Sequence, residues 1–299
     1  MAHAEIRRFL HANYNCRHLD VLERWYTDLF ALKPVMRSDN ASTDSIAFGL
    51  REVTTTSTIF LYDHRGGRRT TSLELVGWHH PDVIGSPYEH AWEHGIQSVG
   101  YVVDDLDAVE RKAQAAGGRV VRRVKGALLL RDPEGVAVEV IAGAANPPEA
   151  HHMRIVVSDL NRTIDWYSSL GMTLSPESVL VPGEQLWEGN KDHAIASEAA
   201  MVGTDDRTYS LVFNTWSGPP PIGPPYLTNY HNGVYRFAVA VDDVYAAFEN
   251  LRAAKLAAYP PYTFALPGTP ITDGLTILFI RDPDGILVEL VQRPRSFFK

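Results

Sequence analysis

The segment Arg131-Asp-Pro-Glu-Gly-Val-Ala-Val-Glu139 returns 150 residues later as Arg281-Asp-Pro-Asp-Gly-Ile-Leu-Val-Glu289. Pro at the second position and Gly at the fourth position of each Asp-Pro-x-Gly stretch favour a type I turn. An apolar run lies on either side of each turn, so the sequence predicts a β-hairpin at both places. A hairpin that occurs twice at such a distance indicates an internal repeat, and the extent of that repeat decides the fold.

The repeat extends through both halves of the chain. Gly95–Leu106 matches Gly233–Val244 at an offset of 138 residues, and Leu10–Tyr26 matches His151–Tyr167 at an offset of 141. Each block begins with a β-like run and continues with apolar residues at helical spacing. The linker-like stretch Ala142–Glu149, rich in Ala and Pro, separates the halves. The sequence therefore predicts two β-α-β-β-β units in each half and four modules in the whole chain.

Composition narrows the classes of partner. The chain has 28 Lys and Arg against 36 Asp and Glu, a net charge of −8, so we expect no nucleic-acid partner. One cysteine, Cys16, cannot form an internal disulfide. Since the start lacks the apolar run of a signal peptide and no apolar stretch could span a bilayer, the sequence predicts a cytoplasmic protein without a membrane partner. The sequence does not decide the oligomeric state, and a homo-oligomer is one alternative.

These motifs resemble the vicinal oxygen chelate superfamily, which includes glyoxalase I, methylmalonyl-CoA epimerase, the fosfomycin- and bleomycin-resistance proteins and the extradiol dioxygenases. The resemblance rests on the His-x6-His/Asp-Leu opening of modules one and three and on the Asp-Pro-x-Gly-x3-Glu ending of modules two and four. It implies an α+β fold of four βαβββ modules, paired into two cupped mixed β-sheet domains with helices outside, over residues 1–145 and 146–299. Metal ligands are implied on the first and last strands of each module.

Aligning the four modules by their repeat gives the residue at each of these implied ligand positions, here called slots. The first-strand slots hold His11, Ser98, His152 and Arg236, and the last-strand slots hold Glu74, Glu139, Val212 and Glu289. In the N-terminal half, His11, Glu74 and Glu139 are thus the expected ligands of a divalent metal, Fe(II), Mn(II), Zn(II) or Ni(II), with Ser98 as a weak fourth. The alternative is a pocket in which His11 only hydrogen-bonds to the two carboxylates. No nucleotide cofactor is expected.

The C-terminal half departs from the extradiol pattern, because Arg236 occupies the slot of the second metal-binding His. A guanidinium stays protonated and has no lone pair to give to a metal. We therefore expect Arg236 to pair with Glu289 or to hold an anionic oxygen of a substrate. Together with His152 these two residues are the catalytic candidates of this half. His193 is a fourth, since it resembles the acid–base His of extradiol enzymes.

Three functions fit the resemblance, each with a small-molecule partner. Four modules in 299 residues resemble the two-domain extradiol dioxygenases, so metal-dependent cleavage of a small oxygen-bearing molecule, aromatic ones included, is the first expectation. The second is a glyoxalase- or epimerase-like isomerase, lyase or hydrolase that uses the N-terminal His/Glu/Glu pocket, with a carboxylate as general base. The third is a non-enzymatic protein of the bleomycin-resistance kind, which sequesters a small molecule.

Overall fold

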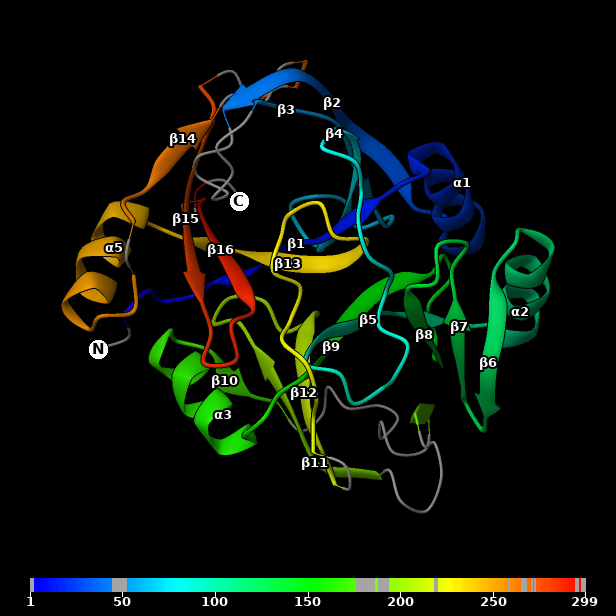
Figure 1. Ribbon diagram of the computed structural model, residues 1–299. Helices are drawn as coiled ribbons and strands as arrows, with labels where there is room; N and C mark the ends of the chain where they lie inside the picture. The colour runs from blue at the N-terminus through cyan, green and yellow to red at the C-terminus, as the bar shows by residue number, and fades with distance from the viewer. Residues whose placement is uncertain are drawn as a thin grey trace.

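The computed structural model describes residues 3–44, 53–175, 186–187, 194–217, 220–257, 259–264, 268–269, 271, 273–293 and 296. Within these ranges the chain forms two eight-stranded mixed sheets and four helices. Figure 1 shows each sheet curling around its own open side, with the central strands of both sheets back to back in the middle of the molecule. The predicted α+β fold of two cupped sheets built from four modules is confirmed.

The first sheet, here the first cup, combines modules one and four in the order β14-β15-β16-β13-β1-β4-β3-β2. Its central strands β1 and β13 run antiparallel, whereas β4 and β16 pair with them in parallel. The strands are β1 (Arg8–Cys16), β2 (Lys33–Asp44), β3 (Val53–Tyr62), β4 (Ser72–His80), β13 (Gly233–Val241), β14 (Tyr262–Phe264), β15 (Leu275–Arg281) and β16 (Leu287–Gln292).

The second sheet, here the second cup, combines modules two and three in the order β10-β11-β12-β9-β5-β8-β7-β6. Its central strands β5 and β9 are antiparallel, and β8 and β12 flank them in parallel. The strands are β5 (Gly95–Val103), β6 (Arg119–Val124), β7 (Ala127–Arg131), β8 (Ala137–Ala142), β9 (Glu149–Val156), β10 (Thr173–Leu174), β11 (Ala194–Val202) and β12 (Ser210–Ser217).

The pairing of modules differs from the expectation that each half of the chain closes its own sheet. Each cup takes one module from 1–145 and one from 146–299, and the boundary at 145 lies between β8 and β9 of a single sheet. The physical reason is that the first strands of all four modules offer equivalent edges, so the repeat does not specify which copy supplies the partner. The connections before β5 and β13 lie together, where Tyr88 stacks on Tyr226 with ring centroids 4.1 Å apart.

The helices follow the first strand of each module and lie on the convex side of the sheets. They are α1 (Leu19–Phe30), α2 (Leu106–Ala115), α3 (Leu160–Ser169) and α5 (Val244–Ala253). Asp105, Asp159 and Asp243 accept backbone N–H bonds at the starts of the last three helices, as N-caps do. Within the described residues, none of the helices is long and apolar enough to cross a membrane.

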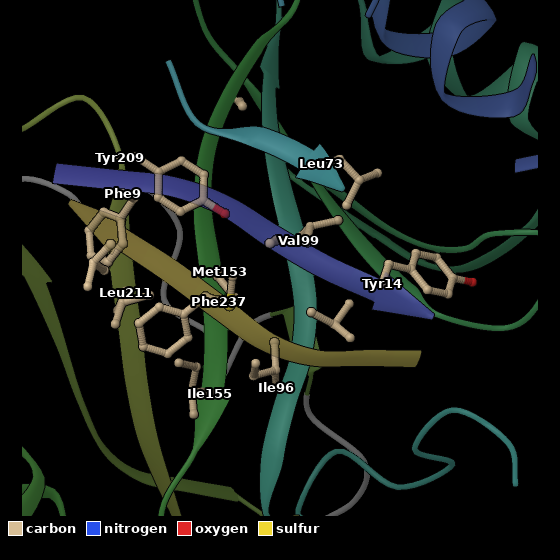
Figure 2. Packing of buried hydrophobic residues seen from close by; sticks show 14 of the residues in the cluster. Phe9, Tyr14, Leu73, Ile96, Val99, Met153, Ile155, Tyr209, Leu211 and Phe237 are labelled. Carbon is tan, nitrogen blue, oxygen red and sulfur yellow. The ribbon is translucent and has the colours of Figure 1, made fainter. Parts of the chain in front are cut away.

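The main hydrophobic core lies between the convex faces of the two cups. Phe9 of β1 and Phe237 of β13 contribute from the first cup, and Met153 and Ile155 of β9 contribute from the second. Figure 2 shows β1 and β13 crossing over β5 and β9 with these apolar side chains between them. The convex faces are buried in this core. Polar side chains of the central strands therefore face the concave sides of the cups.

Candidate functional site

A β-bulge precedes each of the four first-strand slots. Between the paired central strands, the residue just before each slot is left without a partner in the antiparallel register. Such an extra residue shifts the alternation of side chains by one position, so that the next residue turns to the other face. Each slot residue therefore faces the concave side. The bulged residues are Leu10, Gln97, His151 and Tyr235, and the slots that follow them are His11, Ser98, His152 and Arg236.

Four slot residues meet on the floor of the first cup: His11 from β1, Glu74 from β4, Arg236 from β13 and Glu289 from β16, here called the tetrad. His11 Nε2 lies 3.2 Å from Glu74 Oε2 and 3.5 Å from Glu289 Oε2. Arg236 Nε donates to Glu289 Oε2 at 2.8 Å, and Arg236 Nη2 lies 3.5 Å from Glu74 Oε2. All four residues are buried. The contact between Arg236 and Glu289 that the sequence predicted is present.

Neighbouring side chains hold the tetrad in place. Asn13, two residues after His11 and therefore on the same face of β1, donates from Nδ2 to Glu74 Oε2 at 2.8 Å. The ring of Phe60 meets the ring of His11 edge-on, with centroids 5.5 Å apart. The Arg236 guanidinium lies 5.8 Å from the ring centroid of Phe279. Each charged group is thus fixed by contacts on more than one side.

The electrostatics of the tetrad centre on Glu289. Burial opposes ionisation of this carboxyl, but Arg236 and then His11 outweigh burial and lower its pKa to about 2. Burial likewise opposes the charge of Arg236, whose pKa is nevertheless raised by Glu289 and Glu74. The two glutamates are balanced by Arg236 and, when it takes up a proton, by His11. The tetrad is therefore neutral with His11 protonated and carries one negative charge with His11 neutral.

The family resemblance implies a divalent metal, but these residues do not fit one. The oxygens that could coordinate a metal together with His11 are Glu74 Oε2 and Glu289 Oε2, the same atoms that the Arg236 guanidinium contacts. A divalent ion about 4 Å from that guanidinium would be repelled by about 8 kcal/mol at an effective dielectric constant near 20. Among the described residues, no three His, Cys, Asp or Glu side chains are grouped to hold a metal ion.

A cavity of about 340 Å³ opens above His11. Its walls are mainly apolar and come from both modules of the cup, with Met36 and Phe60 on one side and Leu275 and Val291 on the other. His11 is the only member of the tetrad that lines the cavity within the part of the chain that the structure describes. A ligand of this cup therefore meets the imidazole first, and the carboxylates lie behind it.

The second cup holds a different cluster around Glu139 of β8. Ser98 Oγ and Trp187 Nε1 donate to Glu139 Oε1 at 2.5 and 2.9 Å. Arg154 donates from Nε to Oε1 at 2.7 Å and from Nη2 to Oε2 at 3.0 Å. His152 Nε2 lies 3.2 Å from Oε2. The two carboxylate oxygens thus have about as many partners as they have lone pairs, so they have little capacity left for a ligand.

The surroundings of Glu139 suit a structural cluster. Burial opposes its ionisation, but Arg154 and then His152 hold its pKa well below the usual range. Leu186, Trp187 and Trp216 form a buried apolar group on the concave side. A Cβ atom at Gly100 would lie 2.0 Å from the His152 ring, so this imidazole also needs a glycine beside it. The charges of the second cup are buried like those of the first, and Trp187 also packs against them.

The predicted grouping of site residues is corrected by these contacts. His11 and Glu74 do meet, but the third acidic residue beside them is Glu289, because Glu139 lies in the other sheet. In the same way, His152 contacts Glu139 and not Glu289. Both errors follow from the pairing of modules one with four and two with three. His193 lies outside the described residues.

Sequence reasoning missed several residues of the two clusters. Asn13 and Arg154 are equivalent in the repeat, and each follows its slot by two residues on the same strand face, a signal that strand alternation could have supplied. Trp187, which donates to Glu139 Oε1, lies outside the repeated blocks. Arg68 and Arg293, which line the cavity of the first cup, have no counterpart in the repeated blocks.

Comparison with known proteins places these observations in a family. The model of the Glyoxalase/Bleomycin resistance protein/Dioxygenase superfamily matches residues 8–140 and again residues 149–290. A lactoylglutathione lyase of Arabidopsis thaliana is 24% identical over 306 residues, which cover 98% of this chain and 94% of the relative. A "probable lactoylglutathione lyase" of Vibrio parahaemolyticus is 26% identical over 151 residues, or 48% of this chain and 91% of the relative.

A solved structure shares the fold. The crystal structure of glyoxalase I from Zea mays is similar with a TM-score of 0.66 and 23% identity, covering 95% of this chain and 92% of that one. At this level of identity the likeness concerns the arrangement of the four modules and not the reaction. The residues of the first cup must therefore carry any inference about chemistry.

Proposed function

The chain belongs to the Glyoxalase/Bleomycin resistance protein/Dioxygenase superfamily, and we propose that its first cup catalyses proton transfer on a small organic molecule, as an isomerase or lyase. The observation that carries this proposal is the position of His11. It lines the cavity of about 340 Å³, and the carboxylates of Glu74 and Glu289 stand behind its Nε2. An imidazole backed by carboxylates is a general base whose protonated form is stabilised.

The proposed chemistry uses both nitrogens of His11. With Nε2 turned toward the carboxylates and carrying the proton, Nδ1 has the lone pair that can accept a proton from a substrate. The imidazolium formed in this step is then offset by Glu74 and Glu289. Returning the proton to another atom of the same substrate gives isomerisation, and loss of a leaving group after proton removal gives a lyase reaction. Glu74 and Glu289 act in this scheme as positioning residues.

Arg236 has a supporting part in the proposal. It keeps the carboxylate of Glu289 ionised, with a pKa of about 2, so that Glu289 does not take the proton that His11 must exchange. Its fixed positive charge stands where a metal-binding His is found in the extradiol pattern. The reaction we propose therefore draws on His11, and not on a metal ion held by this cup. The names of the curated relatives also support a lyase over the ring-cleaving dioxygenase that the sequence first suggested.

The proposal is tested by proton exchange in D2O. The protein is incubated with 2-oxo acids, α-hydroxyketones and hemithioacetals, and loss of the α-proton signal is followed by NMR. We expect exchange that EDTA does not abolish and that His11→Gln slows at least about a hundredfold. His64→Gln, at an exposed histidine outside the cavity lining, is the matched control and should exchange like the wild type.

Two outcomes would count against this function. Exchange that requires an added divalent metal, or that persists in His11→Gln, would mean that His11 is not the base. Tight binding of a small molecule without any exchange, equally strong in His11→Gln, would favour the sequestering protein of the bleomycin-resistance kind.

A further inference from the structure

A tyrosine lines the same cavity as His11. Tyr62 is the last residue of β3 and follows Phe60 by two positions, so both rings stand on one face of that strand. The ring of Phe60 meets the imidazole of His11 edge-on, and all three residues line the cavity of about 340 Å³. A phenol and an imidazole are thereby presented to one small space.

The strand register places Tyr62 and His11 in one row across three strands. Ser72 of β4 is the partner of His11 in the parallel pairing with β1. Leu61 pairs with Leu73 between β3 and β4, so the next position in this register sets Tyr62 beside Ser72. Since neighbouring strands lie about 4.8 Å apart, the Cα atoms of Tyr62 and His11 are roughly 10 Å apart. A small substrate above Ser72 can therefore touch both side chains.

Contacts on two sides hold the phenol ring. A side-chain hydrogen bond joins Tyr62 to Ser72, whose hydroxyl also donates to the carbonyl of Leu10 at 3.2 Å. Gly67 lies against the ring, because a Cβ atom added there would be 3.1 Å from Cε1 of Tyr62 and 3.5 Å from its hydroxyl oxygen. The phenol is thus held by Ser72 on one side and by a residue without a side chain on the other.

The phenol remains a hydrogen-bond donor at neutral pH. Burial raises the pKa of Tyr62 above its ordinary value of 10, and the Glu74 carboxylate acts in the same direction. The hydrogen bond with Ser72 and the charge of Arg293 oppose burial without reversing its effect. Tyr62 therefore keeps its proton and can donate a hydrogen bond to a ligand oxygen.

We propose that Tyr62 holds the carbonyl oxygen of the substrate, which is a small carbonyl compound with a hydrogen on the neighbouring carbon. This inference rests on the proposed function in taking His11 as the base. When His11 removes that proton, the C–H electron pair forms a C=C bond and the carbonyl π pair moves onto oxygen. Tyr62 donates its hydrogen bond to the charge that develops there and keeps its own proton. The imidazolium then returns its proton to carbon, which closes the cycle.

The walls of the cavity strengthen such a hydrogen bond. Met36, Phe60 and Leu275 line the same space and are apolar. Because apolar walls keep water away, a donor aimed at a developing oxyanion is worth more there than in water. Removing one such donor typically slows a reaction by about 10²–10³. The role we assign to Tyr62 thus predicts a large effect from the loss of one hydroxyl group.

Proton exchange in D2O by the Tyr62→Phe variant tests this role. The change keeps the ring and removes only the hydroxyl, so the urea midpoint of unfolding should stay that of the wild type. We expect exchange of the α-proton to be about a hundredfold slower, with the dissociation constant of the substrate within about threefold. Tyr245→Phe, at an exposed tyrosine on α5, is the matched control and should exchange like the wild type.

Binding of an oxyanion probe tests the oxygen site without any reaction. 4-Nitrophenolate and its methyl ether, 4-nitroanisole, differ at the charged oxygen, and ligand-observed NMR at pH 8.5 follows the binding of both. We expect Tyr62→Phe to weaken binding of the phenolate at least about tenfold and to leave that of the ether within about twofold. The same loss should occur when Tyr62→Phe is combined with His11→Gln.

The outcomes separate this inference from the proposed function. Exchange that His11→Gln slows and Tyr62→Phe leaves unchanged would overturn the role of Tyr62 and keep that of His11. Loss of phenolate binding in Tyr62→Phe, for a wild type that shows no exchange, would support the oxygen site and overturn the proton transfer. Phenolate that fails to bind the wild type, or that binds Tyr62→Phe equally tightly, would overturn the oxygen site.

Discussion

Replacing Arg236 by Gln should lower the free energy of unfolding, because it breaks the buried ion pair between Arg236 and Glu289. Glu289 is 2% exposed, and its pKa of about 2 lies well below its ordinary value of 4.5. At about 1.4 kcal/mol for each pKa unit, ionised Glu289 contributes roughly 3 kcal/mol of stability at neutral pH. Because the pKa is lowered in the folded state, this contribution is complete above the unfolded pKa and is lost as the pH falls toward 2.

Arg236→Gln removes the cation and leaves two buried carboxylates beside His11. We expect a loss of about 3–5 kcal/mol at pH 7, the range for breaking a buried pair. The pH dependence should also reverse, because burial without a partner raises the pKa of a carboxyl group. The variant should therefore regain stability as the pH falls from 7 to 5, where the wild type gains nothing from this site.

Urea unfolding at pH 5, 6 and 7 measures both effects. Burial raises the pKa of Asp132 to about 7 and that of Asp282 to about 6, so both titrate in this window in either protein. The difference between the variant and wild-type curves is therefore the quantity to compare, with Arg252→Gln as an exposed control. An Arg236→Gln protein as stable as the wild type at pH 7, or a difference that does not change with pH, would show that Arg236 does not stabilise the ionised form of Glu289.

Two further changes test the second cup and the hairpin turns. Glu139→Gln removes the carboxylate that Arg154 contacts through two nitrogens and leaves Glu198 as its remaining carboxylate partner, so urea unfolding should show a loss smaller than the about 3–5 kcal/mol of a fully unpaired buried charge, while ligand binding to the folded first cup is retained. Loss of first-cup binding in the folded variant would contradict the structural role. The carboxyl of Asp132 has its pKa raised by burial, so wild-type stability should fall as the pH rises from 5 to 8. Asp132→Asn should reduce that slope to the part that Asp282 contributes, and an unchanged slope would contradict the raised pKa of Asp132.

The sequence was sufficient for the architecture because turn chemistry and apolar periodicity repeat. The Asp-Pro-x-Gly hairpins at 132–135 and 282–285 mark the ends of modules two and four, and the offsets locate the other strands. The same logic found the slot residues, including Arg236 and Glu289. The repeat did not predict which slots meet. Since β5 and β13 have the same sequence pattern, either could pair with β1, and the folded chain pairs β1 with β13.

Other features depend on long-range packing that no local pattern reveals. The bulges at Leu10 and Tyr235 turn His11 and Arg236 to the concave face, yet neither residue type marks a bulge. The cavity is lined by chain segments that differ between modules, and Arg293 lies beyond the last repeated block. The apolar group of Leu186, Trp187 and Trp216 in the second cup likewise includes residues outside the repeated blocks.

We propose that Arg236 takes the place of a metal ion in the first cup and leaves His11 to move protons. Metal retention by purified variants tests this proposal. Wild type, Arg236→His, and Arg236→His combined with His11→Ala are loaded with Zn(II), or anaerobically with Fe(II), freed of excess ion by gel filtration and analysed for metal. We predict no stoichiometric metal in the wild type, about one ion per chain in Arg236→His, and loss of that ion in the double variant. Stoichiometric metal in the wild type that disappears in His11→Ala would contradict the claim.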